Sequence, residues 1–112
     1  MKKINILKKN EDFNRIIASI KPYKYKDYII YKEKHNFGIS HFGISVGKKV
    51  GNAVTRNHIK RQLKNIIDQI PYKNDFNCII IVRKGIIGKS FLEMKNDLIE
   101  AMKQVHILEE NE

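Results

Sequence analysis

The chain has 112 residues, and its 22 Lys and Arg against 12 Asp and Glu give a formal net charge of +10 at pH 7. This length and a hydrophobic content of 42% predict one folded domain over residues 1–112, while the excess of positive charge favours nucleic acid or an anionic membrane surface as the partner. No apolar run approaches the ~20 residues of a membrane span, the single Cys excludes an internal disulfide framework, and the basic N-terminus lacks a signal-peptide core. We therefore expect a cytoplasmic protein that does not insert into a membrane.

The first predicted element is a helix. The sequence Asn10-Glu11-Asp12 is a plausible start, because Asn can cap a helix and acidic residues are favourable in its first turn. Pro22 predicts the end of the helix soon afterwards. Apolar residues recur between these points at helical spacing: Phe13, Ile16, Ile17 and Ile20.

Two segments then have the composition of strands. Residues 27–33 are rich in aromatic and β-branched side chains, and residues 42–46 alternate large and small ones. Residues 37–41 are interpreted either as an extension of the second strand or as a separate hairpin partner. These segments predict two or three strands before the next helix.

The second half predicts a helix, a strand and a helix. Residues 53–70 are predicted to form the first of these helices, which ends before Pro71. Residues 78–82 are a short β-branched run typical of a central strand buried on both faces. Ser90-Phe91-Leu92-Glu93 matches a capping box. An apolar stripe continues from it through Phe91, Leu98, Met102 and Val105. The order α-β-β(β)-α-β-α predicts a small α/β sandwich around one sheet.

The most informative stretch is the basic run over residues 48–64. It lies within residues 34–67, which contain seven Lys and Arg, three His and no Asp or Glu. At about 100° per residue, one face of the predicted helix is apolar: Ile59, Leu63, Ile66, Ile67 and Ile70. The opposite face carries Asn57, Lys60, Arg61 and Lys64, with Arg56 at the border.

A charged run is often only a solvated helix face. Here the stretch without Asp or Glu extends well beyond the helix. The like charges on the helix repel one another and lower its stability. An unneutralised positive field of this kind attracts phosphodiester backbones. The sequence therefore predicts nucleic-acid binding.

The run Lys48-Lys49-Val50-Gly51-Asn52-Ala53-Val54-x-Arg56-Asn57-x-x-Lys60-Arg61 resembles the signature of the bacterial ribonuclease P protein subunit. Three other segments are similar to that family in order and spacing, and the resemblance covers nearly the whole chain. They are residues 7–13, residues 43–46 (Gly-Ile-Ser-Val) and residues 79–84 (Ile-Ile-Ile-Val-Arg-Lys).

The resemblance implies an α+β, two-layer sandwich of order α-β-β-β-α-β-α with a left-handed β-α-β crossover. It implies a subunit of an endoribonuclease holoenzyme that removes the 5′ leader of precursor tRNA. The expected partners are the catalytic RNA and precursor tRNA, with no obligate protein partner. It also implies that the RNA carries the chemistry and its Mg²⁺, while the chain has no catalytic residue, metal site or cofactor of its own.

The resemblance also implies two sets of binding residues. The catalytic RNA is expected on Lys48, Lys49, Asn52, Arg56, Asn57, His58, Lys60, Arg61 and Lys64. The single-stranded leader is expected on Phe13, Tyr31 and Ser45. From the residues alone, Phe13 favours the core, Tyr31 fits either role, and Ser45 fits simple strand patterning.

Two positions depart from the family pattern. His58 stands where the family usually has Arg, so a permanent charge becomes a titratable one. Ile17 stands where relatives often have an aromatic residue, which removes one stacking surface. We expect both departures to weaken RNA affinity.

Two other functions remain as alternatives. One is a ribosomal or general RNA-binding module without a role in processing. The other is a self-sufficient nuclease, which is disfavoured because no carboxylate pair lies among the basic residues. The four His residues show no metal-ligand spacing with Cys78, which is interpreted as a small core residue.

Overall fold

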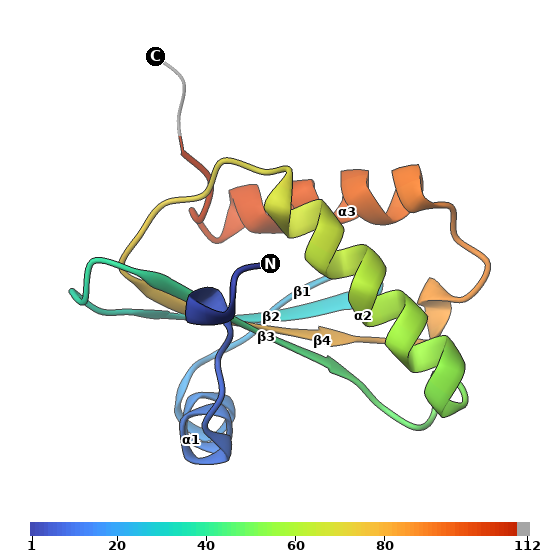
Figure 1. Cartoon of the computed structure of the whole chain (residues 1–112), viewed down its shortest axis with the longest axis horizontal. Coiled ribbons are helices and arrows are strands. Elements are labelled where there is room, and N and C mark those ends of the chain that lie inside the picture. The colour runs from blue at the N-terminus through green and yellow to red at the C-terminus, as the bar shows by residue number, and fades with distance from the viewer. Residues whose placement is uncertain (110–112) are drawn as a thin grey trace.

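The fold is a sheet with helices on both faces, seen in a computed structural model that describes residues 1–109 (Figure 1). The sheet has four strands in the spatial order β1-β2-β4-β3. Strand β4 lies antiparallel to β2 and parallel to β3. The strands are β1 (Tyr23–Tyr25), β2 (Tyr28–Lys34), β3 (Ser40–Val46) and β4 (Phe76–Val82).

The helices divide unevenly between the two faces of the sheet. Helix α1 (Asn10–Ser19) covers one face alone, whereas α2 (Ala53–Asp68) and α3 (Phe91–Gln104) pack side by side on the other (Figure 1). Helix α2 forms the left-handed crossover between the parallel strands β3 and β4. Short 3₁₀ turns at Lys3–Asn5 and Lys84–Ile86 complete the order. None of the helices described in residues 1–109 is long and apolar enough to cross a membrane.

The main core lies between the sheet and the pair α2 and α3. Alternate residues of β2 face it, and the Tyr28 hydroxyl donates a hydrogen bond of 3.0 Å to the Met94 carbonyl of α3. Strand β4 has neighbours on both sides and helices on both faces, so its residues 76–80 are all buried. The predicted central strand is confirmed, with a start two residues earlier than expected.

The structure corrects the start of α1. The N-cap residue is Lys9, Asn10 is already helical, and within the described residues no side chain caps this helix. The backbone carbonyl of Lys9 accepts the Phe13 amide at 3.2 Å, so the first turn closes one residue earlier than the sequence suggested. Glu11 and Asp12 do lie in the first turn, as predicted.

The third strand was also misplaced. It is β1, which precedes β2, whereas residues 37–39 belong to the β2–β3 loop and residues 40–41 extend β3. Helix α2 ends at Asp68 and not at residue 70, because the Gln69 amide bonds the carbonyls of both Ile66 and Ile67 and tightens the last turn. The capping box of α3 is confirmed, although Phe91 is 36% exposed and does not belong to the buried stripe.

Candidate nucleic-acid interface

Helix α2 begins at a side-chain cap. The Asn52 Oδ1 accepts the Thr55 amide at 2.9 Å, and the Asn52 carbonyl accepts the Arg56 amide at 2.9 Å. Asn52, predicted as an RNA contact, therefore also fixes the direction of the helix. Its side-chain oxygen already accepts one hydrogen bond from the helix, whereas its side-chain NH₂ group donates to no other described residue.

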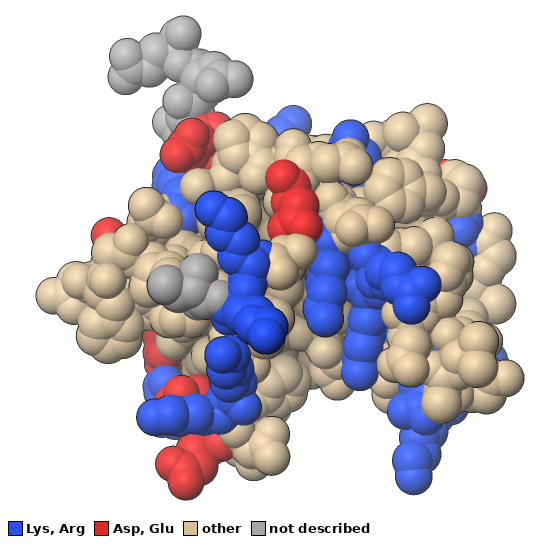
Figure 2. Space-filling view, viewed as in Figure 1, with Lys and Arg blue, Asp and Glu red and all other residues tan. Residues whose placement is uncertain are grey.

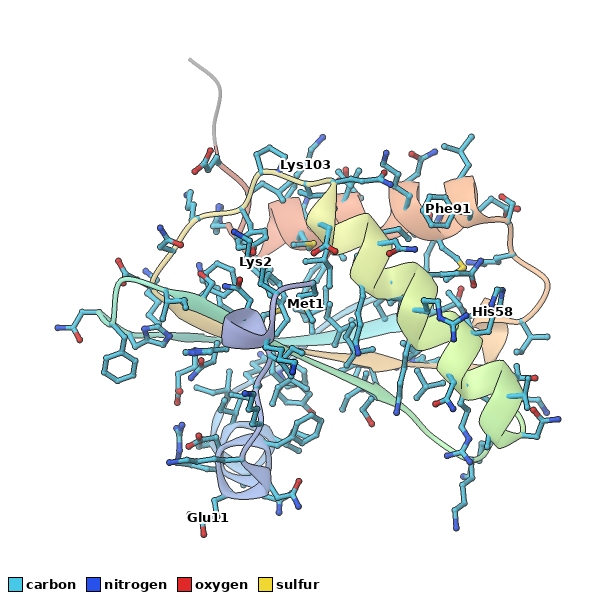
Figure 3. The ribbon with its side chains drawn as sticks, viewed as in Figure 1. Met1, Lys2, Glu11, His58, Phe91 and Lys103 are labelled. Atoms are coloured by element: carbon cyan, nitrogen blue, oxygen red, sulfur yellow. The ribbon has the colours of Figure 1, made fainter. Side chains whose placement is uncertain are left out.

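The apolar face of α2 is as the sequence predicted, but the predicted polar face points outward only in part. The apolar stripe that begins at Ile59 is buried against the sheet and α3, with Leu63, Ile66 and Ile67 fully buried, whereas Val54 in the first turn is 79% exposed. The outer surface presents three polar side chains, Asn57, His58 and Arg61, all exposed. Figure 3 shows His58 on the side of α2 that is turned away from the sheet. The outer surface is thus available to a large partner.

The remaining cations of α2 lie on its flank. Lys60 and Lys64 are half-buried and line a cavity of about 180 Å³ together with Phe13 of α1 and Gly43 of β3. Arg56 is also half-buried, and its Nε is enclosed without a hydrogen-bond partner among the described residues. The flank of α2 therefore faces the edge of β3 and approaches α1 around that edge.

The turn before α2 adds two exposed cations. Lys48 and Lys49 follow β3, and the Val50 amide bonds the Gly47 carbonyl at 3.0 Å to close the turn. Among the described residues, no salt bridge joins a Lys or Arg of residues 48–64 to an acid. The ion pairs lie elsewhere, as in the Lys26–Asp97 and Lys89–Asp97 pairs near α3. Figure 2 shows Lys and Arg gathered over the side formed by α2 and the β3 edge.

The opposite face of the sheet holds the predicted leader residues. Tyr31, Ile79 and Gly43 form one row across β2, β4 and β3. A Cβ added at Gly43 would lie 3.1 Å from the Phe13 Cε2, so the absence of a side chain lets the Phe13 ring rest on β3. Ser45 points to the same face one row further along.

Helix α1 covers this face only in part. Ile16 and Ile79 are fully buried, whereas Phe13, Tyr31 and Ser45 are all half-buried. Phe13 is therefore not the core residue that its place in an apolar stripe suggested. The structure brings all three predicted leader residues to one face, and two of them are aromatic rings, which can stack on unpaired bases.

Sequence reasoning missed two further residues of this face. Ile29 and Ile81 pair across β2 and β4 in the same row as Ser45, and both are half-buried. The period-two alternation of β2 places Ile29 with Tyr31 and could have identified it. Ile81 gave no such signal, because β4 reads as a continuous apolar run.

The single cysteine, Cys78, lies inside strand β4. Cys78 is completely buried, and burial raises the pKa of its thiol to about 12, so it carries no thiolate near neutral pH. Within residues 1–109, no group of three or more His, Cys, Asp or Glu side chains could hold a metal ion.

Together, the fold and the site define a small α/β domain that offers an unneutralised basic helix to a phosphate backbone. A family model described as Ribonuclease P matches residues 1–106. The chain belongs to the ribonuclease P protein family, the protein component of the ribonuclease P holoenzyme.

Individual relatives agree in sequence and in fold. The ribonuclease P protein component of Mycoplasma mobile is 40% identical over 107 residues, which cover 94% of this chain and 93% of the relative. That of Listeria welshimeri is 38% identical, with coverage of 98% and 95%. The structure of the Staphylococcus aureus protein matches with a TM-score of 0.83 at 29% identity, covering 94% of this chain and 98% of the other. The Thermotoga maritima protein matches with a TM-score of 0.78 at 25% identity, covering 88% and 96%.

Proposed function

We propose that this chain binds the catalytic RNA of ribonuclease P with α2 and the turn before it, and holds the 5′ leader of precursor tRNA on the α1 face of the sheet. The outer side of α2 suits a structured RNA, because exposed cations and amides contact phosphates without requiring unpaired bases. The α1 face suits a single strand, because partly open aromatic rings need bases that are free to stack.

The observation that carries this proposal is the junction between the two surfaces. Lys60 and Lys64 of α2 share a cavity with Phe13 and Gly43 at the β3 edge. A leader that leaves the α1 face at this edge meets cations of the helix that holds the catalytic RNA. One small domain can thereby contact the catalytic RNA and the substrate next to each other.

The roles of the protein and of the RNA subunit follow from the same side chains. Cations and aromatic rings lower the free energy of bound RNA, but they do not activate a water molecule for attack on a phosphodiester. We infer that the RNA subunit supplies the reaction and holds its Mg²⁺ ions. The protein contributes by positioning the leader and by neutralising phosphates that would otherwise repel one another.

Reconstitution tests this function. Precursor tRNA is incubated at near-physiological Mg²⁺ with the RNA subunit alone, the protein alone, or both, and leader release is measured. We expect full activity only in the mixture. Cleavage by the protein alone would make it a nuclease, and cleavage by the RNA that does not depend on the protein would leave a general RNA-binding module.

A further inference from the structure

A second cavity opens at the other end of the α1 face. It has a volume of about 510 Å³ and lies between α1, the N-terminal segment and the β2–β3 loop. Phe37, His35 and His41 line one side, and Lys3, Lys8 and Lys9 line the other. It shares Ile6 and Leu7 with the cavity at the β3 edge, so the two cavities lie on either side of the N-terminal segment.

An organised loop holds an aromatic ring at this cavity. Phe37 is 71% exposed, yet its ring stacks on His35 with 4.4 Å between centroids. Asp75 fixes the loop, because its Oδ1 accepts the Gly38 amide at 2.6 Å and its carbonyl accepts the His35 amide at 3.0 Å. Because the backbone of the loop is fixed and the ring already stacks on His35, ordering Phe37 on binding costs less entropy than ordering a ring on a mobile loop.

A chain of hydrogen bonds orients the neighbouring His41. The Glu33 carboxylate accepts from Arg15 and also from the Asn77 side-chain nitrogen, the latter at 3.1 Å. The Asn77 oxygen must therefore face His41, whose Nδ1 lies 2.9 Å away and donates to it. The Nε2 of His41 is left for another partner, and the ring lines the cavity.

The charge of the cavity favours an anion. Its two carboxylates, Asp12 and Glu33, both pair with Arg15. The Arg15 hydrogen bond holds the pKa of Glu33 below its ordinary value, so this carboxylate stays ionised and paired. Lys3, Lys8 and Lys9 are exposed, and none of them forms a salt bridge with another described residue. Three cations therefore line the same cavity as a ring on which a base can stack.

We propose that this cavity binds one unpaired nucleotide of the leader, upstream of the nucleotides held by Phe13, Tyr31 and Ser45. Its base stacks on Phe37, its edge meets the Nε2 of His41, and its phosphates lie near Lys8 and Lys9. The inference rests on the leader-binding function proposed above and extends it to a second subsite.

The positions in β3 set the distance between the two subsites, and Ser45 is nearer than His41 to the basic turn at Lys48 that is proposed to contact the catalytic RNA. His41 and Ser45 point to the same face of β3 and lie four residues apart, which is about 13 Å at ~3.3 Å per residue. A single strand can follow that path past the N-terminal segment. A duplex cannot stack its bases on Phe37 without first unpairing them, so the single-stranded leader fits the cavity better than the folded catalytic RNA does.

Precursor tRNAs with leaders of different lengths test the proposed second subsite. The reconstituted holoenzyme, with wild-type protein or with Phe37→Ala, is titrated against precursor tRNAs whose leaders are shortened one nucleotide at a time from the 5′ end. We expect Phe37→Ala to weaken binding of the longest leader by about 5-fold, the lower end for loss of one stacked base. Phe37→Tyr keeps the ring and should bind normally, and Asn36→Ala is the matched control in the same exposed loop.

The decisive result is the length at which each defect disappears. The Phe37→Ala defect should vanish at a leader length that still shows a Tyr31→Ala defect. A Phe37→Ala defect that persists with mature tRNA, or none at any length, would overturn the subsite while leaving the Tyr31 result to support the main proposal. If Tyr31→Ala shows no defect specific to precursor tRNA, the leader-binding function itself is wrong.

Discussion

Replacing Tyr31 with Ala separates the two proposed RNA surfaces. Tyr31 lies on β2 beside the fully buried Ile79, in the same row as Gly43, on which the Phe13 ring rests. It is far from the outer side of α2, because the sheet lies between them (Figure 1). The substitution should therefore change binding of the leader and leave assembly with the catalytic RNA intact.

The size of the effect follows from the exposure of the ring. Loss of one stacked base costs ~1–3 kcal/mol. Since Tyr31 is half-buried, only part of its ring is open to a base, and we expect the lower part of that range. About 1–2 kcal/mol corresponds to an increase of roughly 5- to 30-fold in Kd for precursor tRNA. Tyr31→Phe should be nearly silent, because stacking uses the ring and not the hydroxyl.

The assay compares Kd values of the holoenzyme for precursor and mature tRNA. The affinity for mature tRNA, which has no leader, should barely change. Because Tyr31→Ala also removes a partly buried ring, thermal unfolding must show that the variant is folded at the assay temperature. Equal losses for the two tRNAs would place Tyr31 in the core or at the assembly surface, and the assignment of Tyr31 to the leader would be wrong.

The other predictions concern the basic face and the ring of Phe13. If ~5–8 phosphates are neutralised, log affinity for the catalytic RNA should fall against log salt with a slope of roughly −4 to −7, and a slope near zero would exclude this face. Arg61→Ala should weaken assembly without changing the melting temperature, whereas Arg56→Ala should also lower it, because Arg56 is half-buried; unfolding of Arg61→Ala would contradict the orientation of α2. His58→Arg should tighten RNA binding because it adds a permanent positive charge to an exposed position of α2, and weaker binding would mean that the imidazole makes a specific contact. Gly43→Ala places a Cβ 3.1 Å from Phe13 and should cost about 1–3 kcal/mol in urea unfolding; an unchanged stability would show that the ring moves freely.

Some elements could be predicted because their signals are local. Helix α2 carries an apolar stripe at helical spacing, and the cap and the outer cations belong to the same stretch of sequence. Helix α3 has a capping box, in which Ser90 and Glu93 bond each other's backbone amides. Strand β4 reads as a buried run because both of its faces are apolar. Interactions within a few residues of one another are enough to specify each of these elements.

The short strand β1 could not be predicted in the same way. It has three residues, and the turn that joins it to β2 contains Lys26 at a φ of +49°, where the sequence offers none of the usual Asn-Gly or Asp-Gly signals. Its existence depends on pairing with β2, so it is a consequence of the assembled sheet. The alternative of a separate hairpin strand at residues 37–41 is wrong, because Asp75 holds residues 35–38 in a loop, while residues 40–41 extend β3 as the other alternative expected.

The sequence by itself determined the basic helix and the family, and through the family resemblance it indicated the residues of the first two proposed RNA surfaces. Only the tertiary structure decided which of them meet. Lys60 and Lys64 share a cavity with Phe13 because α2 crosses over the sheet to its opposite face while its flank reaches the β3 edge. Phe37 and Lys8 line one cavity because the N-terminal segment pairs with β3 through the Leu7 amide and the Phe42 carbonyl. Such contacts join residues that are far apart in the chain. They depend on the packing of the whole sheet, and therefore they cannot be predicted from a local pattern of residues.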